Sequence, residues 1–362
     1  MVFLGSNSDI GTVFAEAAII DRCFMNFVVG AFVAGLIQGL ALGAFGAFQD
    51  SSIYFDLYQI VADQGVQDAF LGFVEQTGKY EPILFLLFSV ESILSGNSLT
   101  EYSFLIVNMV LLNVLVGAVM FTSFKADPLK KKYTFTTGLI VMSGYLVFSK
   151  ELYFWRNIIS FCFFILFVND ASWRRSIWFI AAVLAHASAA LFIPLFLLIE
   201  LVARLNNRYV YWVAFAGLAA VTLVLPQFSE IIGFAASSGD ASIYLEAGGA
   251  HTIKVWLSVL FSLLVLLLVY REYMTNNVLR PLYVFCLATV VVSLLSYESY
   301  HFMNRIFLPA SLIVGFLPFL IEGDRSRSST VRINLARLCI VISVLPTIRL
   351  LTMMFVGDFS PA

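Results

Sequence analysis

Long apolar runs separated by short polar segments fill this sequence between Cys23 and Phe355. A helix needs roughly 20 apolar residues to cross about 30 Å of hydrocarbon, and runs such as Tyr102–Phe124 and Ile333–Phe355 reach that length. Hydrophobic residues make up 60% of the chain and charged residues 12%, a balance outside the range of soluble domains. The sequence therefore predicts an all-α, polytopic integral membrane protein with about 10–12 transmembrane helices, including re-entrant or half helices.

The composition also argues against several classes of function. The net charge of -2 leaves no basic face for a nucleic acid. The four cysteines stand apart within apolar runs, so we expect neither a disulfide framework nor a metal site. The sequence contains no Walker, GxSxG or HExxH pattern, which argues against an ATPase, a serine hydrolase or a zinc protease. We expect no cofactor and no cleavable signal peptide.

Charged loops give the chain an expected orientation, because lysine and arginine favour cytoplasmic loops. The acidic segment Gln49–Glu81 contains Lys79 as its one basic residue and is expected outside, whereas the basic loop at Lys130–Lys132 is expected inside. Residues 1–22 are expected to form a cytoplasmic amphipathic helix. Residues 23–355 then form a single transmembrane domain, with external loops at 49–101, 226–254 and 297–305 and a tail at 356–362.

Two apolar runs fit this topology only if neither makes a single crossing. Pro82–Ser95 is too short to span, and a crossing there would place the following basic loop outside. We therefore predict a re-entrant or interfacial helix on the outer face. A single crossing by Ile177–Val202 would invert every later basic loop, unless the run breaks at Ala185–Ser188 into two short helices. His186 would then lie at a helix break on the outer side, buried or lining a cavity.

Under this topology, ionisable residues collect on the outer face, whereas the inner face holds ordinary anchoring lysines and arginines. Ionisable groups in or near apolar spans are costly and mark candidate functional sites. The outer-face residues are Asp56, Glu81, Arg156, His186, Asp240, His251, Glu298, His301, Arg305 and Arg349. We therefore expect chemistry or recognition on the outer side.

Two of these residues invite a functional interpretation, but each has a structural alternative. Arg156 could bind a diphosphate or carboxylate through its guanidinium fork, or it could anchor a helix end beside Trp155. His186 could be a general base or a ligand for a phosphate or sugar, or a hydrogen-bonded residue that holds a helix break. The segment Glu298–Arg305 could be a catalytic cluster or merely a polar external loop, and carboxylates such as Asp56 are most often simply solvated.

The order of these features resembles the EpsG-like branch of the Wzy polysaccharide polymerases. The similar segments run from about Asp56 to Arg305. They are Asp56-Leu-Tyr58, Tyr80-Glu81-Pro82-Ile-Leu-Phe85, Tyr153-Phe-Trp-Arg156-Asn157, Trp178-Phe179, Ala185-His186-Ala-Ser188-Ala189 and Asn304-Arg305.

The resemblance implies a GT-C-like membrane glycosyltransferase that makes O-antigen, as in lipopolysaccharide biosynthesis, or exopolysaccharide. It would act on the outer face of the bacterial cytoplasmic (inner) membrane and join repeat units carried by undecaprenyl diphosphate. Its partners would be that lipid-linked oligosaccharide, membrane lipid and a chain-length regulator protein. On this basis His186, Glu298 and Asp56 are the catalytic candidates, and Arg156, Arg305 and Arg349 are the candidates for binding the diphosphate. Candidates for binding the acceptor sugar are Tyr58, Glu81, Asp240, Tyr244, Tyr297 and His301.

Three other classes of membrane protein remain as alternatives. A flippase or transporter of lipid-linked oligosaccharides would line a path from one face to the other with charges, whereas here the charges gather outside. A membrane acyltransferase would need chemistry on the inner face. An O-antigen ligase uses the same donor and the same arginine chemistry, so the acceptor distinguishes it from a polymerase.

Overall fold

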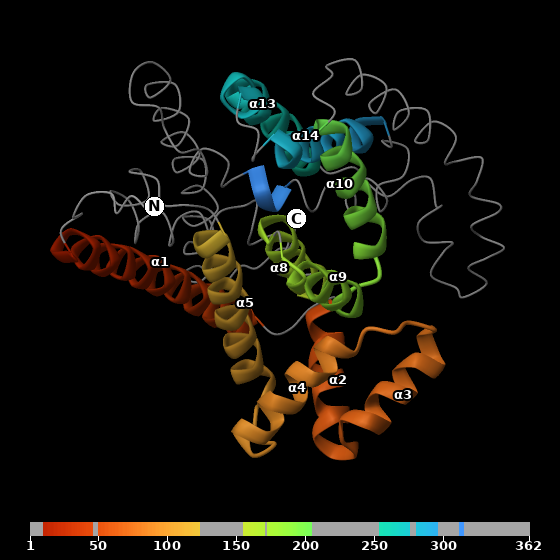
Figure 1. Ribbon diagram of the computed structural model, residues 1–362. Coiled ribbons are helices and arrows are strands. Elements are labelled where there is room, and N and C mark those ends of the chain that lie inside the picture. Colours follow the sequence, from red (N-terminus) through yellow and green to blue (C-terminus); the bar gives the residue numbers. More distant parts are fainter. Residues whose placement is uncertain are drawn as a thin grey trace, which may run out of the picture.

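The computed structural model describes residues 10–45, 50–123, 155–170, 172–204, 253–275, 280–295 and 311–314. Every labelled element in these ranges is an α-helix, which confirms the all-α class for the described part of the chain (Figure 1). The helices are α1 (Ile10–Phe45), α2 (Asp50–Gln64), α3 (Val66–Thr77), α4 (Pro82–Ser95), α5 (Glu101–Ser123), α8 (Trp155–Asn169), α9 (Arg174–Ala185), α10 (Ala189–Arg204), α13 (Ile253–Thr275) and α14 (Arg280–Leu295).

Helices α1 and α5 pack closely because glycines on α1 let the two backbones approach. A Cβ atom at Gly39 would lie 2.6 Å from the Cα of Ile106, and one at Gly35 would lie 2.7 Å from the backbone oxygen of Met109. Small residues four positions apart, as Gly35 and Gly39 are, are typical of helix contacts in membranes. Residue numbers rise along α1 as they fall along α5, so the helices are antiparallel. The end of α1 and the start of α5 therefore lie on the same side.

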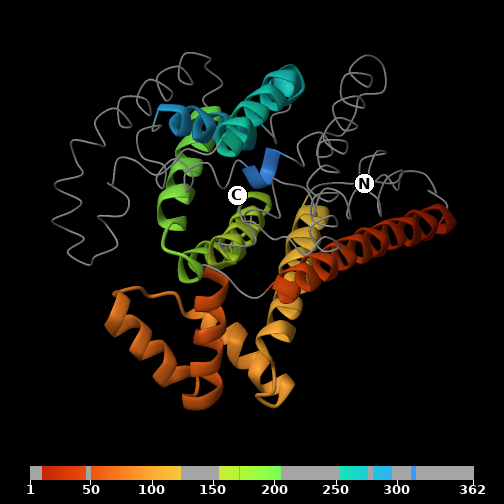
Figure 2. The ribbon, with the colours of Figure 1, turned by 180° about the vertical axis from the view of Figure 1, so that it is seen from behind.

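Helices α2, α3 and α4 occupy the stretch between these two ends and lie together at the lower end of the molecule in Figures 1 and 2. Helix α4 has 14 residues and ends at Gly96, whose φ of 61° is a left-handed conformation that favours glycine. At 1.5 Å per residue it is about 21 Å long, too short to cross a bilayer. The chain thus enters α5 on the side where it left α1. This agrees with the prediction that Pro82–Ser95 does not cross the membrane.

Helices α8, α9 and α10 pass back and forth beside one another. The Ser160 hydroxyl on α8 donates to the Ala182 carbonyl on α9 at 2.8 Å, and the break between α9 and α10 falls at residues 186–188. At the opposite end, Arg175 Nη2 on α9 lies 2.6 Å from Glu200 Oε2 on α10. Helix α10 therefore returns alongside α9 after the break, as the sequence predicted for Ala185–Ser188.

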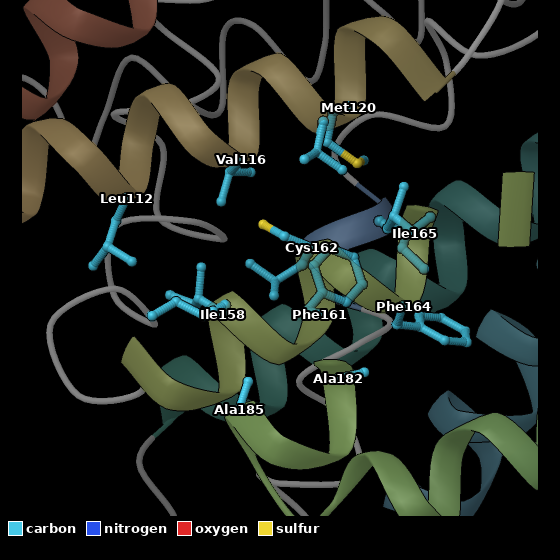
Figure 3. Packing of buried hydrophobic residues seen from close by; sticks show 14 of the residues in the cluster. Leu112, Val116, Met120, Ile158, Phe161, Cys162, Phe164, Ile165, Ala182 and Ala185 are labelled. Carbon is cyan, nitrogen blue, oxygen red and sulfur yellow. The ribbon is translucent and has the colours of Figure 1, made fainter. Parts of the chain in front are cut away.

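The hydrophobic core surrounds α8. Figure 3 shows α5 presenting Leu112, Val116 and Met120 on one side of α8, while Ala182 and Ala185 of α9 lie on the other side. The small alanines bring the α9 backbone close to α8, so buried side chains from α8 fill both interfaces. This packing fixes the first turn of α8 between the other helices.

Two of the described helices contain segments that are long and apolar enough to cross a membrane, Phe24–Gly43 and Glu101–Met120. Apolar side chains also point outward from several helices; Ile93 and Leu94 on α4 are 75% and 82% exposed, and Leu267 on α13 is 61% exposed. Outward-facing apolar surface of this kind is typical of contact with lipid. These features indicate association with a membrane.

Candidate functional site

Three helix ends meet at one buried carboxylate. Glu81 is the residue before α4, Arg156 is in the first turn of α8, and His186 follows the last residue of α9. Arg156 Nη1 lies 2.5 Å from Glu81 Oε2, and His186 Nδ1 lies 2.5 Å from Glu81 Oε1. The backbone N–H of Ala187 donates to the same Oε1 at 3.3 Å. We call Glu81, Arg156 and His186 the buried cluster.

Local sequence explains why these side chains stand at helix ends. Pro82 occupies the first turn of α4, where its missing N–H costs no hydrogen bond. Proline also disfavours helical backbone in the residue before it, and Glu81 has φ −129° and ψ 67°. His186 has an extended backbone and its N–H bonds to the Ala182 carbonyl at 3.0 Å, which ends α9. The side chains of Glu81 and His186 therefore project from the helix ends, where they can face each other.

Glu81 is ionised in this setting. Its side chain is 1% exposed, and burial by itself would raise the pKa of a carboxyl group. The hydrogen bond from His186 and the positive charge of Arg156 outweigh that effect and lower the pKa of Glu81 from its ordinary value of 4.5 to about 2. An ionised carboxylate can only accept hydrogen bonds, so the Nδ1 atom of His186 carries the proton of this contact.

The guanidinium of Arg156 has a second neighbour on α2. Arg156 donates a hydrogen bond to the Tyr54 hydroxyl oxygen, and the Tyr54 ring stacks on Trp155 with their centroids 4.7 Å apart. The Nε of Arg156 and the Nε1 of Trp155 are buried donors that find no acceptor among the described residues. Buried donors are normally paired. A ligand with anionic oxygens would supply acceptors at this place.

A cavity of about 10 Å³ lies beside the buried cluster, between α8 and the start of α10. Its polar lining comes from Asn157, Ser160 and Ser188, and phenylalanines form much of the rest. Asn157 follows Arg156 directly in the chain, and Ser188 lies just after the helix break. The volume is enough for about one water molecule or one hydroxyl group.

No family model, curated protein or solved structure matches this chain. The family resemblance of the sequence therefore remains an expectation, and the site must be judged from its geometry. An arginine, a histidine and a carboxylate that orients both of them can bind an anion and transfer a proton. The described residues contain no group of three His, Cys, Asp or Glu side chains that could hold a metal ion.

The structure brings together three of the residues that the sequence selected and separates two others. Arg156, His186 and Glu81 form the buried cluster, whereas we expected Glu81 to bind the acceptor sugar. Asp56 is exposed on α2. Tyr58 is 1% exposed and packs among aromatic rings, with its hydroxyl 3.1 Å from the Ser95 hydroxyl, so it supports the packing of α2 on α4 and does not present its ring to a sugar.

The remaining predicted site residues lie outside the described residues. They are Glu298, Arg305, Arg349, Asp240, Tyr244, Tyr297 and His301.

Sequence reasoning missed the contacts that hold the cluster together. Glu81 is 75 residues from Arg156 and 105 residues from His186, so no local spacing could pair them. It also missed the contact of Tyr54 with Arg156. The one available signal was the Glu81-Pro82 step, which predicts an extended residue at a helix start.

Proposed function

We propose that this protein is a multi-pass membrane glycosyltransferase that polymerises lipid-linked oligosaccharide repeat units. The growing glycan would be transferred from undecaprenyl diphosphate to a sugar hydroxyl of the next lipid-linked unit, on the outer face of the bacterial cytoplasmic membrane. The observation that carries the proposal is the buried Glu81–Arg156–His186 cluster at a break between apolar helices. The resemblance of the sequence to EpsG-like Wzy polymerases, which implies a GT-C-like architecture, agrees with it.

Arg156 has the chemistry to bind the diphosphate. A guanidinium is always charged and presents a planar fork of donors that matches phosphate oxygens. Its side chain is 21% exposed, so a ligand can reach it. As the glycosidic bond to the diphosphate breaks, negative charge grows on the leaving oxygen, and a fixed cation beside it stabilises the transition state.

His186 has the chemistry to activate the acceptor. With its Nδ1 proton directed at Glu81, the basic lone pair of the neutral ring is on Nε2. In the proposed step, the acceptor oxygen forms the new bond to the anomeric carbon while its proton passes to Nε2. The bond from that carbon to the diphosphate oxygen breaks, and the lipid diphosphate leaves. Glu81 orients the imidazole and balances the charge that it gains.

The packing of the helices supports this arrangement. The chain returns at α4 to the side where α1 ends, and the break between α9 and α10 brings His186 to the same cluster. Charged groups at membrane depth are tolerated where they face a protein interior or a wet cavity. If the basic loops lie inside, as expected, this end of the molecule would face outside, where lipid-linked repeat units are polymerised in the proposed reaction.

The test uses purified protein and a repeat unit linked to a short prenyl diphosphate, without any nucleotide sugar. A ladder of multiples on a gel is expected for the wild type and is expected to be lost in Arg156→Ala and His186→Ala. The control is Arg175→Ala, because Arg175 also pairs with a glutamate, but at the far end of α9. Transport of the substrate across vesicle membranes without a ladder would favour a flippase, and transfer to a lipid A-core acceptor would favour a ligase.

A further inference from the structure

A second buried carboxyl group lies farther along α4, and its surroundings differ from those of Glu81. Glu91 is 5% exposed and faces α5, where Asn108 is fully buried. Asn108 Nδ2 donates to Glu91 Oε2 at 3.2 Å. Burying an ionised carboxylate is very costly unless a charge or several hydrogen bonds compensate it.

The hydrogen bonds of this pair leave two acceptors unsatisfied. The amide nitrogen of Asn108 has two hydrogens, and its second contact is the Phe104 carbonyl at 3.0 Å. This contact fixes the orientation of the amide, because the flipped amide would place its oxygen against two acceptors. Glu91 Oε1 and Asn108 Oδ1 are then buried oxygens that find no donor among the described residues.

We propose that Glu91 is a proton-binding site, which holds its proton on Oε1 and donates it to Asn108 Oδ1. One proton satisfies both oxygens at once. The neutral carboxylic acid and the amide then exchange two hydrogen bonds, while the second amide hydrogen stays with Phe104. The Glu91 carboxylic acid and the Asn108 amide would then join α4 to α5 without a charged group between the two helices.

No charged group with a described side chain near α4 stabilises the ionised form of Glu91. Arg175 on α9 pairs with Glu200, and Arg174 is exposed. The buried tyrosines of α2 are engaged elsewhere, Tyr54 with Arg156 and Tyr58 with Ser95. The carboxylates with described side chains on the neighbouring helices are all exposed: Asp56 and Asp63 on α2, Asp68 and Glu75 on α3, and Glu101 on α5. Glu91 thus has no cation beside it in the described part of the chain, whereas Glu81 has three donors that favour its ionised form, Arg156, His186 and the N–H of Ala187.

Infrared spectroscopy tests the proposal directly. A carboxylic acid has a carbonyl stretch that is separate from the carboxylate bands and shifts in D₂O. The spectrum of the wild type at neutral pH minus that of Glu91→Gln should contain this acid band. The same difference taken with Glu75→Gln, an exposed carboxylate, should lack it. Absence of an acid band from the Glu91 difference would overturn the proposal.

Thermal unfolding gives a second, independent measurement. Glutamine reproduces both hydrogen bonds of a protonated Glu91, so the melting temperature of Glu91→Gln should stay within about 2 °C of the wild type at neutral pH. The wild type should lose stability as the pH rises above about 4.3, the ordinary pKa of glutamate, because from there only the folded state holds the proton, and Glu91→Gln should lose less. A melting temperature that rises with Na⁺ or K⁺ in the wild type but not in Glu91→Gln would overturn the proposal in favour of a metal cation.

Discussion

Replacement of Glu81 by glutamine is the most informative change to the buried cluster. The amide keeps the size and shape of the side chain but removes its charge. It has one acceptor oxygen, whereas the carboxylate accepts bonds from Arg156 and His186 at two separate oxygens. The substitution therefore leaves a buried guanidinium without its counterion and turns an N–H group toward one of the two former donors.

The magnitude follows from the pKa of Glu81. A shift from 4.5 to about 2 corresponds to about 3 kcal/mol of interaction that favours the ionised form in the folded protein. Removal of one partner from a buried ion pair costs about 3–5 kcal/mol, in agreement with that value. At about 2.1 cal/mol/K of unfolding entropy per residue, a chain of 362 residues should melt about 4–7 °C lower in Glu81→Gln than in the wild type.

The pH dependence of stability gives the same test without a mutation. Because the folded pKa is depressed, the stabilisation by Glu81 is fully present above pH 4.5 and is lost as the pH falls toward about 2. Melting temperatures of wild type and Glu81→Gln should therefore converge in acid. Glu75→Gln is the matched control, since Glu75 is exposed on α3. Equal melting temperatures of Glu81→Gln and wild type at pH 7, with an unchanged polymerisation rate, would refute the role of Glu81 in the cluster.

Three further changes test diphosphate binding, the packing of two helices and one buried hydrogen bond. Arg156→Lys keeps a charge but loses the planar fork, so polymerisation should fall about 10- to 100-fold, whereas Arg175→Lys should stay within about twofold in the same gel assay. Gly39→Leu places a side chain where a Cβ would be 2.6 Å from an α5 backbone carbon and should lower the free energy of unfolding by about 1–3 kcal/mol. Gly72→Ala, which has open space around its Cβ, should be neutral or stabilise by up to about 1 kcal/mol in that measurement. Tyr58→Phe removes one hydrogen bond and should cost about 1 kcal/mol of stability without changing KM for the repeat unit.

Helix lengths and the helix break could be predicted from the sequence because both follow from local rules. Pro82–Ser95 is bounded by a proline and by Gly96, and its 14 residues form the short helix α4. The break after α9 falls at Ala185–Ser188, where the counting of basic loops required it. The number of membrane crossings strongly constrains the predicted topology, since one crossing too many puts every later loop on the wrong side of the membrane.

The faces of the helices could not be predicted in the same way. Helix α4 has apolar residues on both its buried and its exposed sides, so periodicity does not distinguish a core position from a lipid-facing one there. Glu91 on α4 is buried although it only interrupts an apolar run, and Tyr58 on α2 is buried although we expected it to present a sugar-binding ring. The contacts of Glu81 join distant segments, and such pairings arise from the tertiary packing of α4, α8 and α9.

Comparison of the two glutamate–arginine pairs indicates why the buried cluster is a functional candidate. Arg175 and Glu200 join α9 to α10 at a wetter place, with side chains 20% and 21% exposed, and Arg175 also lies over the ring of Phe167. The carboxylate of that pair is less desolvated than Glu81, and the pair suits a structural link. Glu81 is 1% exposed, and apolar residues would stabilise such a position at least as well as an ion pair. A buried carboxylate that fixes both a guanidinium and an imidazole at a helix break gains little stability over that alternative, so its advantage lies in the anion binding and proton transfer that its two partners provide.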